Sequence, residues 1–412
     1  MFDFQLEYMK FIPAFLWILC LLNCSPSSSS VADAPISDKE QSITEKRLEL
    51  GIERTSIYLP YLKNKKIALV VNQSSILKKM HLVDSLIKLG IHIEKIFAPE
   101  HGFRGKADAG EKIQDSKDEL TGITIKSLYG SNKKPKPKDL ENIDCILFDL
   151  QDVGVRFYTY ISTLHYIMES CAENNIQLIV LDRPNPNGHY VDGPILEAKH
   201  KSFVGMHSVP VVHGMTIGEY AQMIDGEYWL KDSAQCNPKI IKCANYNRNK
   251  PYSLSIAPSP NLKSDQAIAL YPSLCFFEGT DISVGRGTED PFTIYGHPSF
   301  NMDYSFTPIP REGAKHPKHN KKQCFGVDLK AFPTPMNQLN IDWLIEAYRL
   351  YEPKEEFFNS FFNLLAGTSK LKSQIKEGLN AEEIRSSWKE DLELFQKVRA
   401  KYLCYPDKTN KP

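Results

Sequence analysis

Four short apolar runs in the first half of the chain constrain its fold more than any other feature. They span residues 66–71, 93–98, 143–148 and 176–181, and each ends in a polar cluster. Nearly continuous apolar runs indicate strands that are buried on both faces, which is typical of a parallel sheet. Segments with helical spacing, 81–89 and 160–173, lie between these runs. This alternation predicts an α/β layer that is doubly wound or Rossmann-like.

Polar side chains gather where these runs end, which is the edge at which open parallel sheets bind ligands. Glu100, His101 and Arg104 follow the second run, and the glycines beside them let the chain turn tightly. The later clusters contain Gln151, Asp152, Arg156 and Tyr158, then Asp182, Arg183 and Asn185, and finally Glu278 and Arg286. One such cluster could serve only in caps, turns and ion pairs, but their recurrence indicates a ligand site. Arginine beside tyrosine and amide groups suits a sugar with an anionic substituent, because guanidinium binds carboxylate through two hydrogen bonds.

Several functional classes find no support in the sequence. Fifty basic and fifty acidic residues give a net charge of zero, which argues against a nucleic-acid binder with a broad basic field. Neither a dinucleotide fingerprint, a Walker A loop nor a serine-hydrolase elbow is present, so no cofactor is expected. His207 and His213 would suit a metal-dependent deacetylase, but their spacing matches no standard zinc motif, and we expect no metal. The Lys-rich stretch 315–322, with His316 and His319, is expected to be solvated.

The N-terminus has the pattern of an export signal. Its apolar run, 11–22, is too short to span a bilayer comfortably and favours a secretory signal. The four residues that end in Cys24 resemble a bacterial lipoprotein box, and a Ser-rich stretch follows. We therefore expect a signal peptide over residues 1–23, lipidation of Cys24 and a flexible tether over 24–45. This would place the protein in the bacterial cell envelope as a periplasmic lipoprotein, anchored in the inner or outer membrane. The alternative is ordinary cleavage and a soluble product.

A set of motifs, taken together, resembles the exo-β-N-acetylmuramidase family. The motifs lie, in family order, at residues 98–105, 148–160, 181–186, 202–205, 213–216, 258–261, 278–280 and 285–288. The resemblance runs from about Gly51 to the C-terminus. It implies a Rossmann-like domain joined to a smaller C-terminal α/β domain, with the active site in the cleft between them. We place these domains at residues 46–240 and 241–412.

The resemblance also implies an activity and an acid. The activity is the removal of terminal β-linked N-acetylmuramic acid from the non-reducing ends of peptidoglycan fragments. The family's glutamate occupies the motif of Glu100, and His101 beside it can tune its protonation, so Glu100 is the expected general acid. A structural Glu100 that pairs only with Arg104 is the alternative. Glycoside cleavage usually needs a second carboxylate, for which Glu278 competes with Asp152 and Asp182.

Substrate recognition is expected to involve the remaining polar residues of the motifs. One of Arg156, Arg183 and Arg286 should hold the lactyl carboxylate. Gln151 and Asn185 should bind hydroxyl or acetamido groups, and Tyr158 and Arg104 complete the predicted binding set. A rival interpretation is a periplasmic lipoprotein that captures cell-wall sugars without catalysis, and such a protein would not need Glu100.

Overall fold

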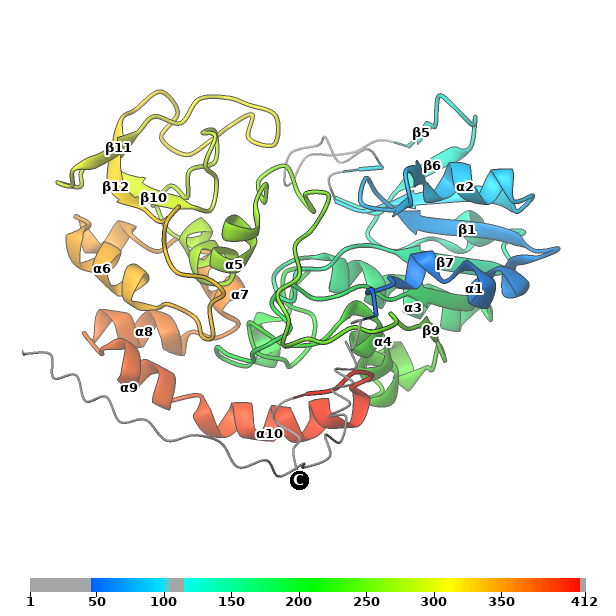
Figure 1. Ribbon diagram of the computed structural model, residues 1–412. Helices are drawn as coiled ribbons and strands as arrows, with labels where there is room; N and C mark the ends of the chain where they lie inside the picture. Colours follow the sequence, from blue (N-terminus) through cyan, green and yellow to red (C-terminus); the bar gives the residue numbers. More distant parts are fainter. Residues whose placement is uncertain (1–45, 101, 104–114, 408–412) are drawn as a thin grey trace, which may run out of the picture. The chain divides into compact units, whose positions relative to one another are not determined.

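The computed structural model describes residues 46–100, 102–103 and 115–407 (Figure 1). The predicted signal peptide and tether, with Cys24, lie outside the described residues, as do His101 and Arg104. Among the residues that are described, no helix combines the length and the apolar character needed to cross a membrane.

The four apolar runs form the centre of a seven-stranded sheet within the described part of the chain. Its strands, in the order β5-β6-β4-β1-β7-β8-β9, are β5 (Ser116–Lys117), β6 (Thr124–Ser127), β4 (His92–Ala98), β1 (Lys66–Val71), β7 (Cys145–Asp149), β8 (Gln177–Leu181) and β9 (Lys239–Ile241). Every neighbouring pair is parallel except β5 and β6. The prediction of a Rossmann-like parallel sheet is therefore confirmed, and the predicted domain boundary between residues 240 and 241 falls inside β9.

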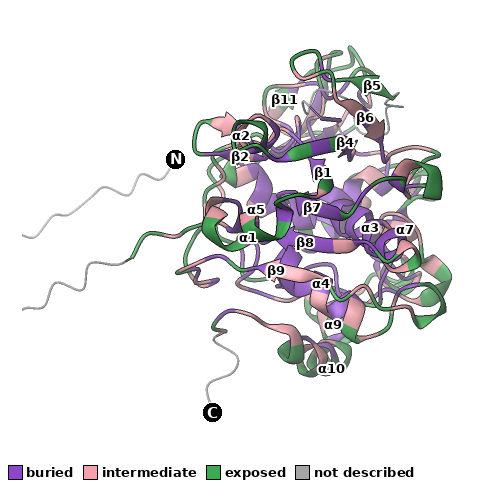
Figure 2. Cartoon of the chain, turned by 90° about the vertical axis from the view of Figure 1, so that its right-hand side faces the viewer, coloured by how far each residue is buried: buried purple, intermediate pink, exposed green. Residues whose placement is uncertain are grey.

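Alternate residues of the central strands supply the cores on the two faces of the sheet. On one face, Ala68 and Val70 belong to a cluster that includes residues of α3 (Tyr160–Asn174) and α4 (Ile217–Gly226). On the other face, Leu69 packs with residues of α1 (Thr55–Leu62) and α2 (Leu82–Lys88). Figure 2 shows β1, β7 and β8 in the colour of buried residues between these helices. Each fully buried aliphatic side chain contributes about 1.5–3 kcal/mol, so two-sided burial fixes the layer.

The C-terminal half is built around a smaller antiparallel sheet. Its strands, in the order β10-β12-β11, are β10 (Ile294–His297), β12 (Cys324–Asp328) and β11 (Tyr304–Phe306). The helices here are α5 (Asp265–Leu274), η5 (Cys275–Gly279), α6 (Asp342–Leu350), η6 (Lys354–Glu356), α7 (Phe362–Ala366), α8 (Lys370–Lys376), α9 (Ala381–Ser386), α10 (Lys389–Arg399) and η7 (Ala400–Tyr402). The elements that remain are η1 (Gly51–Glu53), β2 (Ile76–Leu77), β3 (Met80–His81), η2 (Pro137–Leu140), η3 (Ala198–His200) and η4 (Lys231–Ser233).

One expected helix is interrupted. Helical spacing predicts a continuous helix over residues 381–401, but the chain breaks between α9 and α10, where Trp388 has φ −117°. The side chain of Trp388 is buried, and its indole Nε1 donates to Asp192 Oδ1 at 3.2 Å. Burial of this large ring and the hydrogen bond that its N–H donates stabilise the break more than a continuous helix would be stabilised. Helix α10 then runs back toward α4 (Figure 1).

Arg156 ties the loop after β7 to the C-terminal half. Its side chain is fully buried, and its two terminal nitrogens donate to four carbonyl oxygens. The acceptors belong to Pro194, Val209, Leu365 and Ala366, at 2.7–3.0 Å. Because a buried guanidinium needs such partners, these bonds hold the loop that follows β7 against α7.

Candidate active site

A cavity of about 750 Å³ lies where the loops after β4 and β7 meet the C-terminal half. Its polar lining includes Glu100, Thr159, Ser259, Cys275, Glu278, Ser283, Arg286, Lys315, His316 and Lys318. Its aromatic lining consists of Tyr129, Phe157, Tyr158, Phe203, Tyr271, Phe292 and Phe361. Aromatic walls with a few converging polar groups are the usual composition of a small-molecule site.

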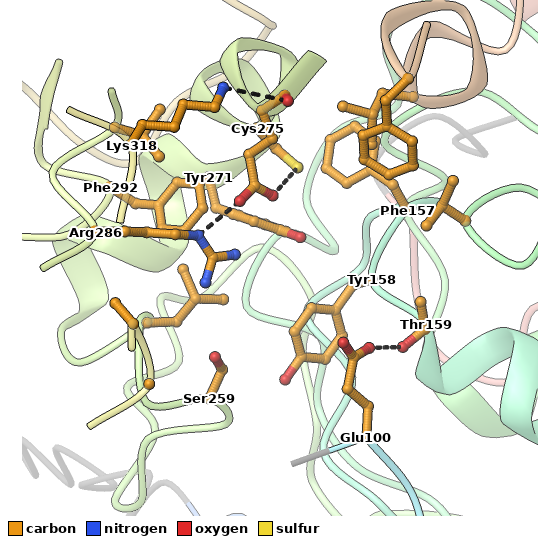
Figure 3. Close-up of a pocket in the computed structure, with 18 of the residues that line it drawn as sticks. Glu100, Phe157, Tyr158, Thr159, Ser259, Tyr271, Cys275, Arg286, Phe292 and Lys318 are labelled. Atoms are coloured by element: carbon orange, nitrogen blue, oxygen red, sulfur yellow. Dashed lines mark hydrogen bonds and ion pairs between the residues drawn. The ribbon is translucent and has the colours of Figure 1, made fainter. Parts of the chain in front are cut away.

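Glu100 reaches this cavity from the carboxyl end of a central strand. It lies two residues beyond the last residue of β4 and is half-buried. The hydroxyl of Thr159 donates to Glu100 Oε2 at 2.7 Å, from the residue that precedes α3 (Figure 3). Two elements of the rigid sheet layer therefore orient one carboxyl group into the cavity, as the general-acid prediction requires.

A second carboxylate, that of Glu278 in η5, enters the cavity lining from the C-terminal half. Arg286 Nε donates to Glu278 Oε1 at 2.6 Å, and Cys275 Sγ lies 3.5 Å from Oε2. Burial alone would lower the pKa of Arg286, but the Glu278 carboxylate outweighs burial and raises that pKa. The guanidinium also lies over the ring of Phe292, 5.2 Å from its centroid. Figure 3 shows this guanidinium turned toward the side of the cavity that holds Glu100 and Tyr158.

Lys318 supports the segment that carries Glu278. Its ammonium donates to the carbonyl oxygens of Phe277, Glu278 and Ile282 at 2.9, 3.3 and 3.4 Å, and to that of Thr280. Burial lowers the pKa of Lys318 to about 8. The expectation that this Lys-rich stretch is solvated is therefore wrong for Lys318, because four carbonyl dipoles replace its water.

The aromatic lining contains one residue that the sequence assigns to the hydrophobic core. Periodicity favours a core role for Phe357, Phe358, Phe361 and Phe362. Phe361 is instead 36% exposed and lines the cavity, whereas the other three are buried. Tyr158 lines the cavity as predicted, and its hydroxyl donates to the Pro258 carbonyl at 2.8 Å.

Of the three described arginines that were candidates for the lactyl carboxylate, Arg286 alone lines the cavity. Arg156 is occupied by its four carbonyl acceptors. Arg183 forms a buried bidentate pair with Asp149, with Nε to Oδ1 at 2.7 Å and Nη2 to Oδ2 at 2.8 Å. The structure thus gives Arg156 and Arg183 the geometry of buried structural groups and leaves Arg286 as the guanidinium that faces a ligand.

The two aspartates that compete with Glu278 are buried away from the cavity lining formed by the described residues. Asp182 accepts hydrogen bonds from Tyr405 Oη at 2.5 Å, Thr216 Oγ1 at 2.9 Å and the Gly218 N–H at 2.8 Å. Burial raises the pKa of Asp182 to about 6 and that of Asp152 to about 7. Neither carboxyl group is placed to reach a sugar in this cavity.

The predicted amide ligands also face the protein interior rather than the cavity. Gln151 Nε2 donates to the carbonyls of Asp152 and Pro184, and Asn185 Nδ2 donates to that of Met215, all at 2.8 Å. Their amides therefore bind backbone carbonyls and hold loops together. His207 and His213 are buried as well, and His207 bonds to Tyr220 and His165.

Sequence reasoning missed several residues of the site. Thr159 lies inside the motif at 148–160, immediately before a helix, and this position was the only sequence feature that could have indicated a role in the site. Phe292 and Lys318 carry no local pattern that distinguishes them from core or surface residues. The sequence suggests that residues 271–274 form an ordered loop over the cleft, but they end helix α5, from which Tyr271 lines the cavity. His101 and Arg104 remain predictions, because they lie outside the described residues.

Comparisons with known proteins place the chain in one family along most of its length. Residues 67–266 match the model described as "exo-beta-N-acetylmuramidase NamZ, N-terminal", and residues 269–405 match the corresponding C-terminal model. Peptidoglycan β-N-acetylmuramidase NamZ of Bacillus subtilis (strain 168) is 35% identical over 422 residues, which cover 96% of this chain and all of that protein.

Solved structures agree with this assignment. A DUF1343 family protein from Bacteroides fragilis NCTC 9343 is 44% identical, with a TM-score of 0.82 over 88% of this chain and 100% of that chain. A second protein of the same family and organism is 26% identical, with a TM-score of 0.76 over 87% and 99%. The resemblance seen in the motifs is thus confirmed, and the chain belongs to the exo-β-N-acetylmuramidase NamZ family of glycoside hydrolases.

Proposed function

We propose that this protein is an exo-acting glycoside hydrolase that releases terminal β-linked N-acetylmuramic acid from the non-reducing ends of peptidoglycan fragments. The observation that carries the proposal is the placement of Glu100 in the cavity that the Glu278–Arg286 pair also lines. The Bacillus subtilis relative, a peptidoglycan β-N-acetylmuramidase, supports the same substrate class.

The chemistry requires a proton at the leaving oxygen and negative charge near the anomeric carbon. Glu100 donates its proton to the glycosidic oxygen as the bond from that oxygen to C1 breaks. Glu278, paired with Arg286, stabilises the oxocarbenium-like transition state from the C-terminal half. Water then supplies the hydroxyl group at C1, and its other proton restores Glu100.

Arg286 gives the proposal its selectivity for muramic acid. Its Nε is bonded to Glu278, and its terminal nitrogens point into the cavity (Figure 3). A lactyl carboxylate is the feature that distinguishes N-acetylmuramic acid from N-acetylglucosamine, and a guanidinium binds such a group through two hydrogen bonds. Tyr158, Tyr271 and Phe292 offer apolar surface to the sugar ring nearby.

A pair of matched fragments tests the proposal. The purified protein is incubated with one disaccharide that has N-acetylmuramic acid at its non-reducing end and with a second that has N-acetylglucosamine there. We expect release of N-acetylmuramic acid from the first to be at least about tenfold faster than release of N-acetylglucosamine from the second. Tight binding of the first without any release would support the non-catalytic binding protein instead, and internal cleavage of long glycan chains would reject the exo-acting mode.

We also propose that the mature protein is a lipoprotein of the bacterial cell envelope, lipidated at Cys24 and facing the periplasm. Support comes from the apolar run 11–22 and the lipoprotein-box residues before Cys24. Anchoring there would keep the cavity among peptidoglycan fragments.

A further inference from the structure

Three potential metal ligands meet beside the wall of the cavity. Asp281 follows η5, His297 ends β10, and His319 belongs to the Lys-rich stretch that also supplies Lys318. One ligand atom from each of the three lies within 4.8 Å of the others. His297 Nε2 is 3.1 Å from Asp281 Oδ2, and His319 Nε2 is 3.9 Å from Asp281 Oδ1 and bonds to the backbone carbonyl oxygen of Asp281 at 2.6 Å.

These separations are close to those of a tetrahedral zinc site. With metal–ligand bonds of about 2.0–2.1 Å, tetrahedral geometry puts ligand atoms about 3.3–3.4 Å apart. The separations of 3.1 Å and 3.9 Å between the imidazole nitrogens and the Asp281 carboxylate oxygens fall on either side of that value. Binding of one ion would require His319 Nε2 to leave the Asp281 carbonyl oxygen and turn toward the Asp281 carboxylate.

The surroundings orient these side chains toward one another. The ring of His297 is 11% exposed, and its Nδ1 bonds to Ser299 Oγ at 2.7 Å, so that Nε2 is the nitrogen that faces Asp281. Tyr351 donates to Asp281 Oδ2 at 3.0 Å. Such bonds from outside the ligand set fix the ring and the carboxylate in metal sites. His319 has a φ of +54°, a backbone conformation that a non-glycine residue adopts at a cost and that turns its ring inward.

We propose that Asp281, His297 and His319 form a binding site for one Zn²⁺ ion. The side chain of Asp281 is 44% exposed, so the ion can enter from solvent and take water as its fourth ligand. Imidazole nitrogens favour zinc and its neighbours over Mg²⁺ or Ca²⁺, which prefer oxygen ligands.

The ion would act on the cavity wall rather than on the substrate. None of the three ligands is among the described residues that line the cavity, so the metal does not face a bound sugar. His319, however, directly follows Lys318, whose ammonium holds the backbone of residues 277–282. Zinc would join that loop to Asp281 and to β10, and so fix the wall that carries Glu278.

Binding of Zn²⁺ alone tests the site without any measure of activity. The full-length protein, treated with chelator and dialysed, is titrated with Zn²⁺ in competition with a chromogenic chelator, and its thermal unfolding is followed with and without the ion. We expect one Zn²⁺ per chain and a rise in Tm of about 3–5 °C when the free ion is at 100 times its Kd. Mg²⁺ at the same concentration should change neither measurement.

Two ligand variants and one control locate the ion. His319→Ala and Asp281→Asn should each weaken Zn²⁺ binding by about tenfold or more. His316→Ala removes an exposed histidine from the same loop, three residues away, and should leave binding unchanged. Asp281→Asn preserves the size of its side chain and serves if the histidine variant fails to fold. Absence of stoichiometric binding, or equal affinity in the wild type and Asp281→Asn, would overturn the proposal, as would equal losses in His316→Ala and His319→Ala.

Discussion

Glu100→Gln is the substitution that most directly tests the proposed mechanism. The amide has the size of the carboxyl group, and its oxygen can still accept the hydrogen bond that Thr159 donates at 2.7 Å. The cavity lining therefore stays intact, and the change in folding stability should be within about 1 kcal/mol. What the variant loses is a proton that it can transfer to the glycosidic oxygen.

The size of the effect should depend on the leaving group. General acid catalysis contributes about 10²–10⁴-fold, which corresponds to about 3–5 kcal/mol of the activation barrier. We expect a loss of this size on a natural disaccharide, whose sugar hydroxyl is a poor leaving group. An aryl N-acetylmuramide with an acidic phenol needs little protonation, so that its rate should fall much less.

The assay compares kcat/KM on the two substrates, together with the melting curve of each variant. Glu94→Gln is the matched control, because Glu94 lies on the same strand, β4, but is exposed and paired with His92. It should leave both rates unchanged. Equal losses of Glu100→Gln on both substrates, with a lowered Tm, would refute the acid role and indicate a structural glutamate.

Three further substitutions test other parts of the argument. Arg286→Gln should reduce the preference for N-acetylmuramides over N-acetylglucosaminides, measured as the ratio of kcat/KM values, by about tenfold or more; an unchanged ratio would remove the carboxylate-recognition argument. Burial raises the pKa of Asp152 to about 7, so the unfolded chain binds fewer protons than the folded one between about pH 4 and 7, and stability falls as the pH rises through that range. The free energy of unfolding is measured with urea at pH 5 and pH 7, and its fall per pH unit should be smaller in Asp152→Asn than in the wild type by up to about 1.4 kcal/mol. An equal pH dependence of stability in the two proteins would contradict this. Cys24→Ser should release the protein from bacterial membranes while Cys20→Ser does not, and unchanged partition of Cys24→Ser in fractionation would reject the lipoprotein box.

The centre of the fold was predictable because its signal is local. Strands β1, β7 and β8 are nearly continuous apolar runs, which have few alternatives to two-sided burial, whereas β4 has exposed polar residues near its start. The edge strand β9 and the outer strand β6 are short and partly polar, and their pairing with β8 and β4 joins segments that are distant in the sequence. The break before α10 has the same origin, since it follows from the burial of Trp388 against Asp192 and not from helical periodicity.

The residue types of the site were predictable from the sequence, but the directions in which their side chains point were not. Glu100, Tyr158, Glu278 and Arg286 line the cavity as expected. Arg156 stands in the same kind of motif as these residues, yet it points into the core. A guanidinium can satisfy its donors with buried carbonyls as well as with a ligand, and the sequence does not show which partners are within reach.

The geometry of Arg286 also explains how one side chain can serve two negative groups. A guanidinium carries five N–H donors in a rigid planar fork. Its Nε is held by Glu278 at 2.6 Å, and this bond fixes the plane, so the terminal nitrogens are aimed before any ligand arrives (Figure 3). A substrate carboxylate bound there would leave the bond to Glu278 in place, because the two anions use different edges of the fork. Lysine offers a point charge without this separation of edges, so it could not hold both groups in the same directions. In the proposed mechanism, recognition of the lactyl group and orientation of the second carboxylate would both depend on Arg286, while Lys318 stabilises the neighbouring segment that carries Glu278.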